Sequence, residues 1–163
     1  MKRNRAALFA AALAVVLWAG PASAEVGYRG WGPRVGISDD PDQIVAGVHW
    51  DLGEFAPRVR FQPSVDFGFG DDALSLSGNA MVGYWFPTKA EVTPYAGGQI
   101  GAVYFDYDSD GKEHDDGSDT EIGLALVGGI ETKLKSGTRF LVELQIGLGD
   151  IPDAKLLAGW TFK

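Results

Sequence analysis

Apolar and polar residues alternate one by one along most of this chain. In the segment 139–149, every second residue from Phe140 to Leu148 is large and apolar, and the positions between them include Glu143, Gln145 and Gly147. A period of two residues is the repeat of a β-strand that has one apolar face. No segment after the first twenty residues keeps the repeat of an amphipathic helix, so the pattern predicts an all-β protein.

Eight alternating segments occur, separated by clusters of glycine, proline and aspartate. The predicted strands cover residues 31–38, 43–52, 58–69, 73–86, 93–106, 120–132, 138–149 and 154–163. An even number of meandering strands predicts an eight-stranded antiparallel up-and-down β-barrel, either soluble or transmembrane. A soluble lipocalin-like barrel in the periplasm would turn its apolar face inward around an apolar ligand, whereas a transmembrane β-barrel turns that face toward lipid.

The polar face favours the transmembrane barrel. It carries charges of both signs among many small residues: Arg34, Asp51, Arg58, Arg60, Asp66, Glu121, Arg139 and Glu143. Eight strands leave an interior just wide enough for side chains, and a buried charge is costly unless it is paired. We therefore expect a plugged polar lumen, with a narrow ion channel as the alternative.

Aromatic residues of the apolar face gather at one end of the predicted strands. They are Trp31, Trp50, Tyr84, Phe86, Phe140, Trp160 and Phe162. A thinner group at the other end comprises Phe67, Phe69 and Tyr104. Such belts are typical of the two lipid–water boundaries of a membrane barrel.

The connections between strands differ in charge at the two ends. Those on the side of the larger aromatic group are short and contain lysines, whereas the four on the other side hold 14 of the 22 acidic residues. These are Asp39, Asp40, Asp42, Asp71, Asp72, Asp106, Asp108, Asp110, Glu113, Asp115, Asp116, Asp119, Asp150 and Asp153. This asymmetry matches short periplasmic turns and longer extracellular loops.

The first residues predict export. Three basic side chains precede an apolar run over residues 6–20 and the triplet Ala-Ser-Ala at 22–24. A signal peptide over residues 1–24 fits this order better than a transmembrane anchor, because a span needs about 20 apolar residues. Residues 25–163 then form one outer-membrane β-barrel domain.

The charge and cysteine content of the chain limit the classes of partner that it could bind. Without the three basic residues of the leader, 11 basic residues face 22 acidic ones, a net charge near −11. This charge argues against binding to nucleic acid. The chain has no cysteine, so disulfides cannot stabilise it. The expected partner is the lipid bilayer of the outer membrane. We expect the barrel to be a monomer in it.

The chain also resembles the small eight-stranded outer-membrane barrels of Gram-negative bacteria, the group of outer-membrane protein X and the transmembrane domain of outer-membrane protein A. The resemblance rests on the leader, on "TPYAGGQIGAVYFDYD" and "TEIGLALVGGIETKL" around the longest loop, and on the closing "LLAGWTFK". Members usually end on an aromatic residue, whereas here Lys163 follows the final Phe162. The resemblance implies a barrel in the cell outer membrane.

The longest loop contains the start of a calcium-binding motif. Asp106, Asp108 and Asp110 precede Gly111 in the order D-x-D-x-D-G. An EF-hand also needs a glutamate at position 12, which here is Gly117, and helices on both sides. The sequence therefore does not predict an EF-hand. Two interpretations remain, namely a looser metal site at these three aspartates and a solvated acidic loop.

Two histidines are the remaining candidates for chemistry. His49 has lumen parity close to Asp51, and a structural hydrogen bond inside the barrel is its simplest role. His114 lies between Glu113 and Asp115 in the acidic loop, where an active site would need partners that the sequence does not supply at recognisable spacing. We therefore predict a non-enzymatic surface or structural protein without a cofactor.

Overall fold

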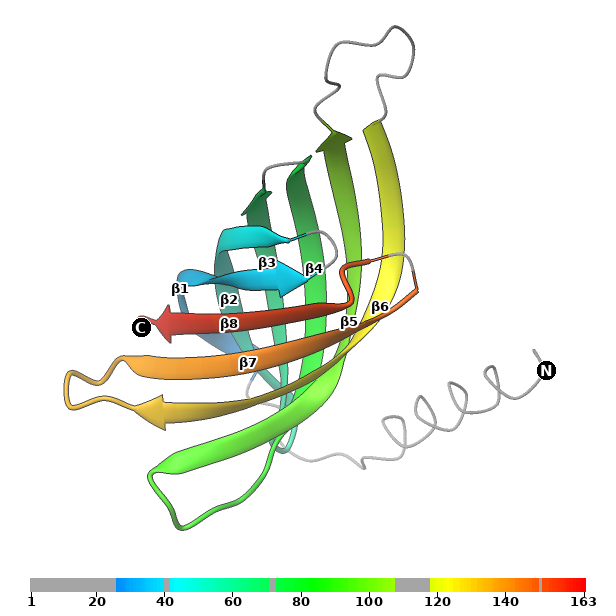
Figure 1. Cartoon of the computed structure of the whole chain (residues 1–163). Coiled ribbons are helices and arrows are strands. Elements are labelled where there is room, and N and C mark those ends of the chain that lie inside the picture. Colours follow the sequence, from blue (N-terminus) through cyan, green and yellow to red (C-terminus); the bar gives the residue numbers. More distant parts are fainter. Residues whose placement is uncertain (1–25, 40–41, 71–72, 108–117, 150) are drawn as a thin grey trace, which may run out of the picture.

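The computed structural model describes residues 26–39, 42–70, 73–107, 118–149 and 151–163, and the predicted leader lies outside them. Eight strands occupy most of the described chain (Figure 1). They are β1 (Val26–Asp39), β2 (Gln43–Ala56), β3 (Val59–Phe69), β4 (Ala73–Trp85), β5 (Val92–Tyr107), β6 (Ser118–Lys133), β7 (Arg139–Leu148) and β8 (Ala154–Thr161).

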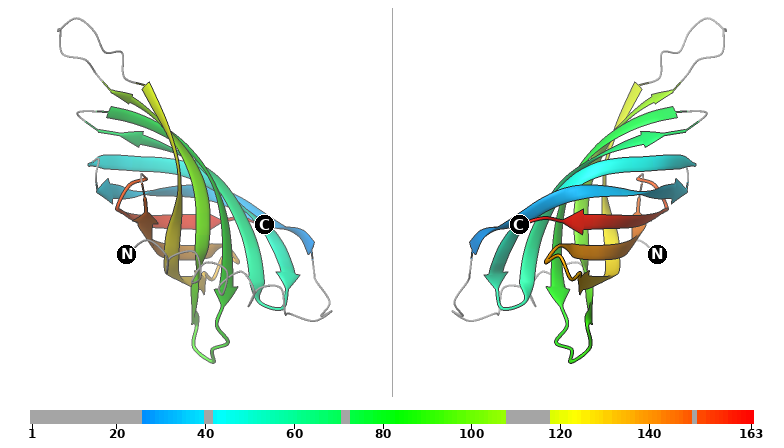
Figure 2. Two further views of the ribbon diagram at one scale, coloured as in Figure 1. Left: turned by 90° about the vertical axis from the view of Figure 1, so that its right-hand side faces the viewer. Right: turned by 90° about the vertical axis from the view of Figure 1, so that its left-hand side faces the viewer.

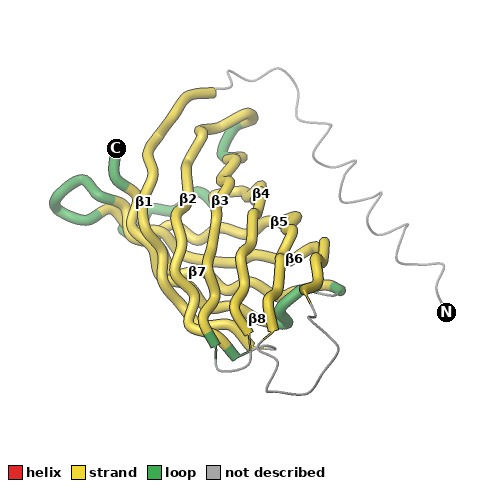
Figure 3. Tube along the Cα trace, turned by 90° about the horizontal axis from the view of Figure 1, so that it is seen from above, coloured by secondary structure: helices red, strands yellow, loops and turns green. Residues whose placement is uncertain are grey.

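The strands form one antiparallel sheet that closes on itself. Each strand pairs with the next along the chain, and β1 pairs with β8 from Arg34 opposite Gly159 to Asp39 opposite Ala154. The side views of Figure 2 show the strong tilt of the strands around the wall. Figure 3 shows strands joined by loops, and the described chain contains no helix long and apolar enough to cross a membrane. The predicted all-β, up-and-down barrel is confirmed.

Two strands extend further than the alternation predicts. β1 starts at Val26 and β2 runs to Ala56, and both of these ends lie at the rim of the barrel where β8 ends. We call this rim the terminal rim and the opposite rim the loop rim. The pairing slips between Val26 and Gly30 and again after His49, where Gly53 has a φ of 87°. The slip after His49 is of one residue, which exchanges inward and outward positions, so the alternation of β2 stops where the strand continues.

The wall is polar inside and apolar outside. Asp51, Asp66 and Glu143 point inward and are 0%, 1% and 3% exposed, whereas Leu126 and Ile122 point outward and are 59% and 70% exposed. This arrangement inverts that of a soluble globular protein, and it contradicts the alternative of a barrel with an apolar interior.

Aromatic side chains cluster on the outer surface at the terminal rim. Trp31 and Phe162 meet edge to face at 6.5 Å, and Tyr84 and Phe86 at 5.2 Å. Phe140 lies 5.3 Å from Trp160, between ring centroids. At the loop rim the exposed aromatic residues are Phe67, Phe69 and Tyr104. Both predicted belts are therefore present on the outer face of the wall.

Candidate functional site in the barrel interior

A buried ion pair joins β1 to β3 in the middle of the interior. Arg34 donates from Nε to Asp66 Oδ1 at 2.6 Å and from Nη2 to Asp66 Oδ2, so the pair is bidentate. The same Nη2 donates to Ser64 Oγ at 2.6 Å, and Asn79 Nδ2 donates to Asp66 Oδ2 at 2.9 Å. These extra hydrogen bonds matter because a buried pair is stable only when its remaining donors and acceptors are also satisfied.

Amide side chains extend this pair across the interior to β7. Tyr95 OH donates to Glu143 Oε2 and Gln145 Nε2 donates to Glu143 Oε1, both at 2.7 Å. Arg34 Nη1 lies 3.7 Å from Glu143 Oε1. Gln99 Nε2 donates to Gln145 Oε1 at 3.2 Å, so residues of β1, β5 and β7 belong to one network.

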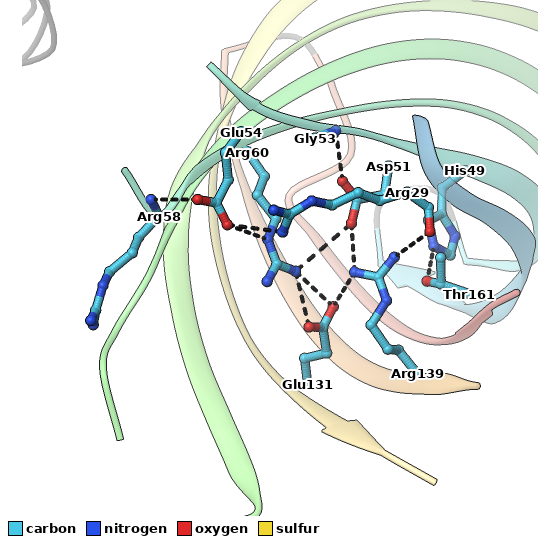
Figure 4. A network of polar contacts seen from close by, with 10 residues as sticks. All are labelled: Arg29, His49, Asp51, Gly53, Glu54, Arg58, Arg60, Glu131, Arg139 and Thr161. Atoms are coloured by element: carbon cyan, nitrogen blue, oxygen red, sulfur yellow. Dashed lines mark hydrogen bonds and ion pairs between the residues drawn. The ribbon is translucent and has the colours of Figure 1, made fainter. Parts of the chain in front are cut away.

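A second charged cluster lies nearer the terminal rim (Figure 4). Arg139 Nη1 contacts Asp51 Oδ2 at 2.5 Å and Glu131 Oε2 at 3.3 Å. Arg60 Nη1 lies 3.0 Å from Glu131 Oε1 and 3.8 Å from Asp51 Oδ2. Two arginines thus alternate with two carboxylates, and each charge has two neighbours of opposite sign.

An aromatic stack supports this cluster from one side. The guanidinium carbon of Arg60 lies 4.5 Å from the ring centroid of Trp85. Trp85 in turn stacks on Tyr95, with centroids 4.7 Å apart and planes 12° apart. Met81 and Val127 complete this buried group. The stack connects the second cluster to Glu143 through the Tyr95 hydroxyl.

The described residues of the interior enclose one small cavity beside this network. A cavity of about 10 Å³ lies against Asn79, Gln99, Gln145 and Lys155. That volume holds about one water molecule.

The eight-stranded wall is similar in fold to known structures. Neisserial surface protein A superposes with a TM-score of 0.67 at 16% identity, covering 87% of this chain and 99% of that one. The fold is that of the small eight-stranded outer-membrane barrels. The N-terminal β-barrel domain of Pseudomonas aeruginosa OprF gives 0.53 at 13% identity, over 83% and 99% of the two chains. Yersinia pestis Ail, in a phospholipid nanodisc, gives 0.50 at 14% identity, over 83% and 98%.

Two comparisons at the level of sequence found no match. No protein-family model matches the sequence, and the search of curated proteins found no match. The low identities to the three solved barrels mean that the likeness is one of fold.

Most charges predicted for the lumen of this outer-membrane-type barrel lie there. Six do so, namely Arg34, Asp51, Arg60, Asp66, Arg139 and Glu143. Glu121 is half-buried near the loop-rim end of β6. Arg58 is a wrong prediction: it is exposed in the turn between β2 and β3, with a φ of 65°. The pairing of Ala56 with Val59 leaves Pro57 and Arg58 as a two-residue loop outside the alternation.

Sequence reasoning missed further charges inside the barrel. Glu131 and Lys155 are buried, and Arg29 pairs with Glu54 at 2.9 Å. The parity of β6 and β8 would have identified Glu131 and Lys155, since each lies an even number of residues from an inward position. Arg29 and Glu54 lie beyond the slips in β1 and β2, where parity no longer predicts facing.

The histidine predicted in the lumen makes a structural hydrogen bond. His49 Nε2 lies 2.8 Å from Thr161 Oγ1, and both residues are 2% exposed. This contact joins β2 to β8 over the inner face of β1, which lies between them, and it confirms a structural hydrogen bond with Thr161 as the partner.

The predicted metal site lies largely outside the described chain. Asp106 is exposed near the end of β5, opposite Ser118 of β6. Asp108, Asp110 and His114 fall in the segment 108–117, which the structure does not describe. The calcium site therefore stays a prediction.

An apolar plug around Ile151 lies in the interior near the loop rim. Ile151, from the connection between β7 and β8, packs with Val103, Phe105 and Ala125 and is 9% exposed. Its position requires glycine opposite, because a Cβ at Gly123 would lie 2.6 Å from Ile151 Cγ2. Ser38, Gln43 and Lys155 are also buried at this rim, so the interior there is partly apolar and partly polar.

Replacing Glu143 with alanine is expected to lower the thermal stability of the barrel. The Tyr95 hydroxyl and the Gln145 amide would lose their acceptor, at a cost of about 1–3 kcal/mol for an unsatisfied buried group. Glu143→Gln keeps an acceptor and should lose less. Melting followed by circular dichroism in detergent micelles tests the order, and equal melting temperatures for wild type and Glu143→Ala would contradict it.

Proposed function

We propose that the protein is a monomeric β-barrel of the bacterial outer membrane. The observation that carries this proposal is the inverted wall: charged residues such as Asp51 and Asp66 are fully buried, while Leu126 in the middle of β6 and Ile122 in its first half are exposed. Only a surrounding hydrocarbon phase makes that distribution favourable. The terminal rim then faces the periplasm, and the loop rim faces the outside of the cell.

We further propose a non-enzymatic role, in which the loop rim presents an acidic surface to the medium. Exposed acids at this rim include Asp39, Asp42, Asp106 and Asp153. His49 is bonded to Thr161 inside the wall, which gives it no access to a substrate at either rim. A surface of one sign of charge attracts cations and basic partners and repels anions.

Cell fractionation tests the location. The protein should remain in the membrane pellet until detergent is added, and an unboiled sample should run at a different position on a denaturing gel from a boiled one. Recovery in an osmotic-shock supernatant, with no effect of boiling on migration, would contradict the proposal.

The interior is proposed to be closed to ions. Paired arginines and carboxylates, a cavity that holds about one water, and the Ile151 plug support this view. The purified barrel in a planar lipid bilayer should therefore show no discrete conductance steps. Steps that occur in wild type, and that change when Arg139 is replaced by glutamine, would instead assign a narrow ion channel.

Divalent cations are proposed as ligands of the acidic loop. Asp106, Asp108 and Asp110 present three carboxylates in the spacing of a calcium loop, without the closing glutamate, so binding should be no tighter than about 10⁻⁴–10⁻³ M. Calorimetric titration with calcium should give a signal that the triple asparagine variant loses. The matched variant Asp39→Asn/Asp42→Asn should keep it, and an equal signal in all three proteins would contradict the site.

A further inference from the structure

The turn between β2 and β3 holds an arginine in an unfavourable backbone conformation. Arg58 has a φ of 65° and is the non-glycine residue with a positive φ in the described chain. Pro57 precedes it, and in a turn with proline first and a left-handed second residue that second position favours glycine or asparagine. Arg58 therefore adopts a backbone conformation that its residue type disfavours, and residues in such conformations cluster at functional sites.

The guanidinium of Arg58 has no ion-pair partner among the described residues. Its backbone nitrogen donates to Glu54 Oε2 at 3.1 Å, while the side chain points away from the charged network (Figure 4). Glu54 is already paired with Arg29 at 2.9 Å and lies 3.7 Å from Arg60. Arg58 is therefore an exposed cation at the terminal rim.

An apolar groove lies on the outer wall beside the turn that carries this cation. Pro57 and Val59, the two chain neighbours of Arg58, line a groove of about 520 Å³ that extends over the outer face of β4 and β5. Pockets that hold small ligands have volumes of about 300–1,000 Å³. The groove is bounded by Phe55 and Tyr84, which belong to the aromatic surface near the terminal rim.

Small residues create the hollow. Ala96 and Gly98 line it on β5, and a Cβ built at Gly98 would meet no atom closer than 3.9 Å. The space beside Val82 is thus left open by the sequence, and a larger residue at 98 could fill it without a clash.

We infer that this groove and Arg58 form a binding site for one phospholipid of the periplasmic leaflet. An acyl chain lies in the groove between Phe55 and Tyr84, and the phosphodiester meets the guanidinium of Arg58 at the boundary. The assignment follows from charge: an unpaired arginine beside an apolar groove at a lipid–water boundary complements an anionic headgroup on a hydrocarbon chain. It rests on the proposed location in the outer membrane.

Native mass spectrometry of the full barrel in detergent micelles tests the site, with dioleoyl phosphatidylglycerol as the probe. Wild type should retain one lipid, and dioleoylglycerol, which has the same chains without phosphate, should not be retained. Arg58→Gln should weaken retention about tenfold, the value expected for loss of one charged hydrogen bond. Gly98→Leu should abolish retention, whereas Gly78→Leu, at an outward glycine of β4 away from this groove, should not change it.

A second variant separates binding from folding. Arg58→Gly removes the cation and also relieves the positive φ, so it should raise the melting temperature while weakening retention as much as Arg58→Gln does. Equal retention by wild type and Arg58→Gln, or equal retention of the two lipids, overturns the inference. A mass that corresponds to two protein chains, in place of the lipid adduct, would mean that a second copy of the chain occupies the groove. That result would also overturn the inference.

Fractionation of the same variants distinguishes failure of the proposed lipid site from failure of the proposed outer-membrane location. Arg58→Gln and Gly98→Leu should remain in the outer membrane with wild type, because neither change alters the inverted wall. If they do so and still retain lipid, only the lipid site is wrong. If wild type itself is soluble, the proposed location is wrong and the lipid site falls with it.

Discussion

Asp66→Ala should destabilise the barrel by about 3–5 kcal/mol, the cost of removing one partner from a buried ion pair. Asp66 accepts two hydrogen bonds from Arg34 and one from Asn79, and it is 1% exposed. The variant leaves the arginine with Glu143 at 3.7 Å as its nearest remaining carboxylate. Equilibrium urea unfolding in phospholipid vesicles, followed by tryptophan fluorescence, measures the loss.

Two controls make this result specific to the pair. Asp42→Ala removes an exposed carboxylate at the loop rim and should stay within about 0.5 kcal/mol of wild type. The double variant Asp66→Leu/Arg34→Met removes both charges, so it should recover most of the stability that Asp66→Ala loses. If Asp66→Ala unfolds at the same urea concentration as wild type, the ion pair does not stabilise the interior.

Leu126→Arg should cost about 2–4 kcal/mol if lipid surrounds the wall, because the substitution places a charge in the middle of the hydrocarbon. Leu126 lies halfway along β6, opposite Gly98 and Ile146 of the neighbouring strands, and is 59% exposed. The same unfolding measurement in vesicles applies.

A matched variant tests the dependence on depth. Phe69→Arg introduces the same charge at the loop-rim end of β3, where the cost near a membrane interface falls to about 0–1 kcal/mol. Wild-type stability of Leu126→Arg would mean that water and not lipid covers the middle of the wall, and it would contradict the proposed location.

The two experiments examine opposite faces of one sheet. The inner face depends on mutual pairing, since each charge is tolerable only beside its partner. The outer face depends on the absence of charge, since no partner is available in hydrocarbon. A strand such as β3 satisfies both conditions, with Asp66 facing inward between Val65 and Phe67 facing outward.

Strand number, strand facing and the aromatic belts were predictable from the sequence. They follow from local alternation, and the period of two in segments such as 139–149 holds wherever the pairing is regular. The inward position of His49 follows from the same rule. The same alternation also predicts that Glu131 and Lys155 face inward, although neither residue stands among the lumen charges expected from the sequence.

The tertiary structure alone decided which side chains meet. His49 bonds to Thr161 and not to Asp51, and Arg139 of β7 pairs with Asp51 of β2, because contacts inside a barrel depend on closure and stagger rather than on sequence distance. The slips near Gly30 and Gly53 and the left-handed turn at Arg58 were hidden for a related reason. Backbone irregularities reverse or end the alternation without changing the residue pattern that precedes them, so the sequence determined the wall while closure determined the contacts within it.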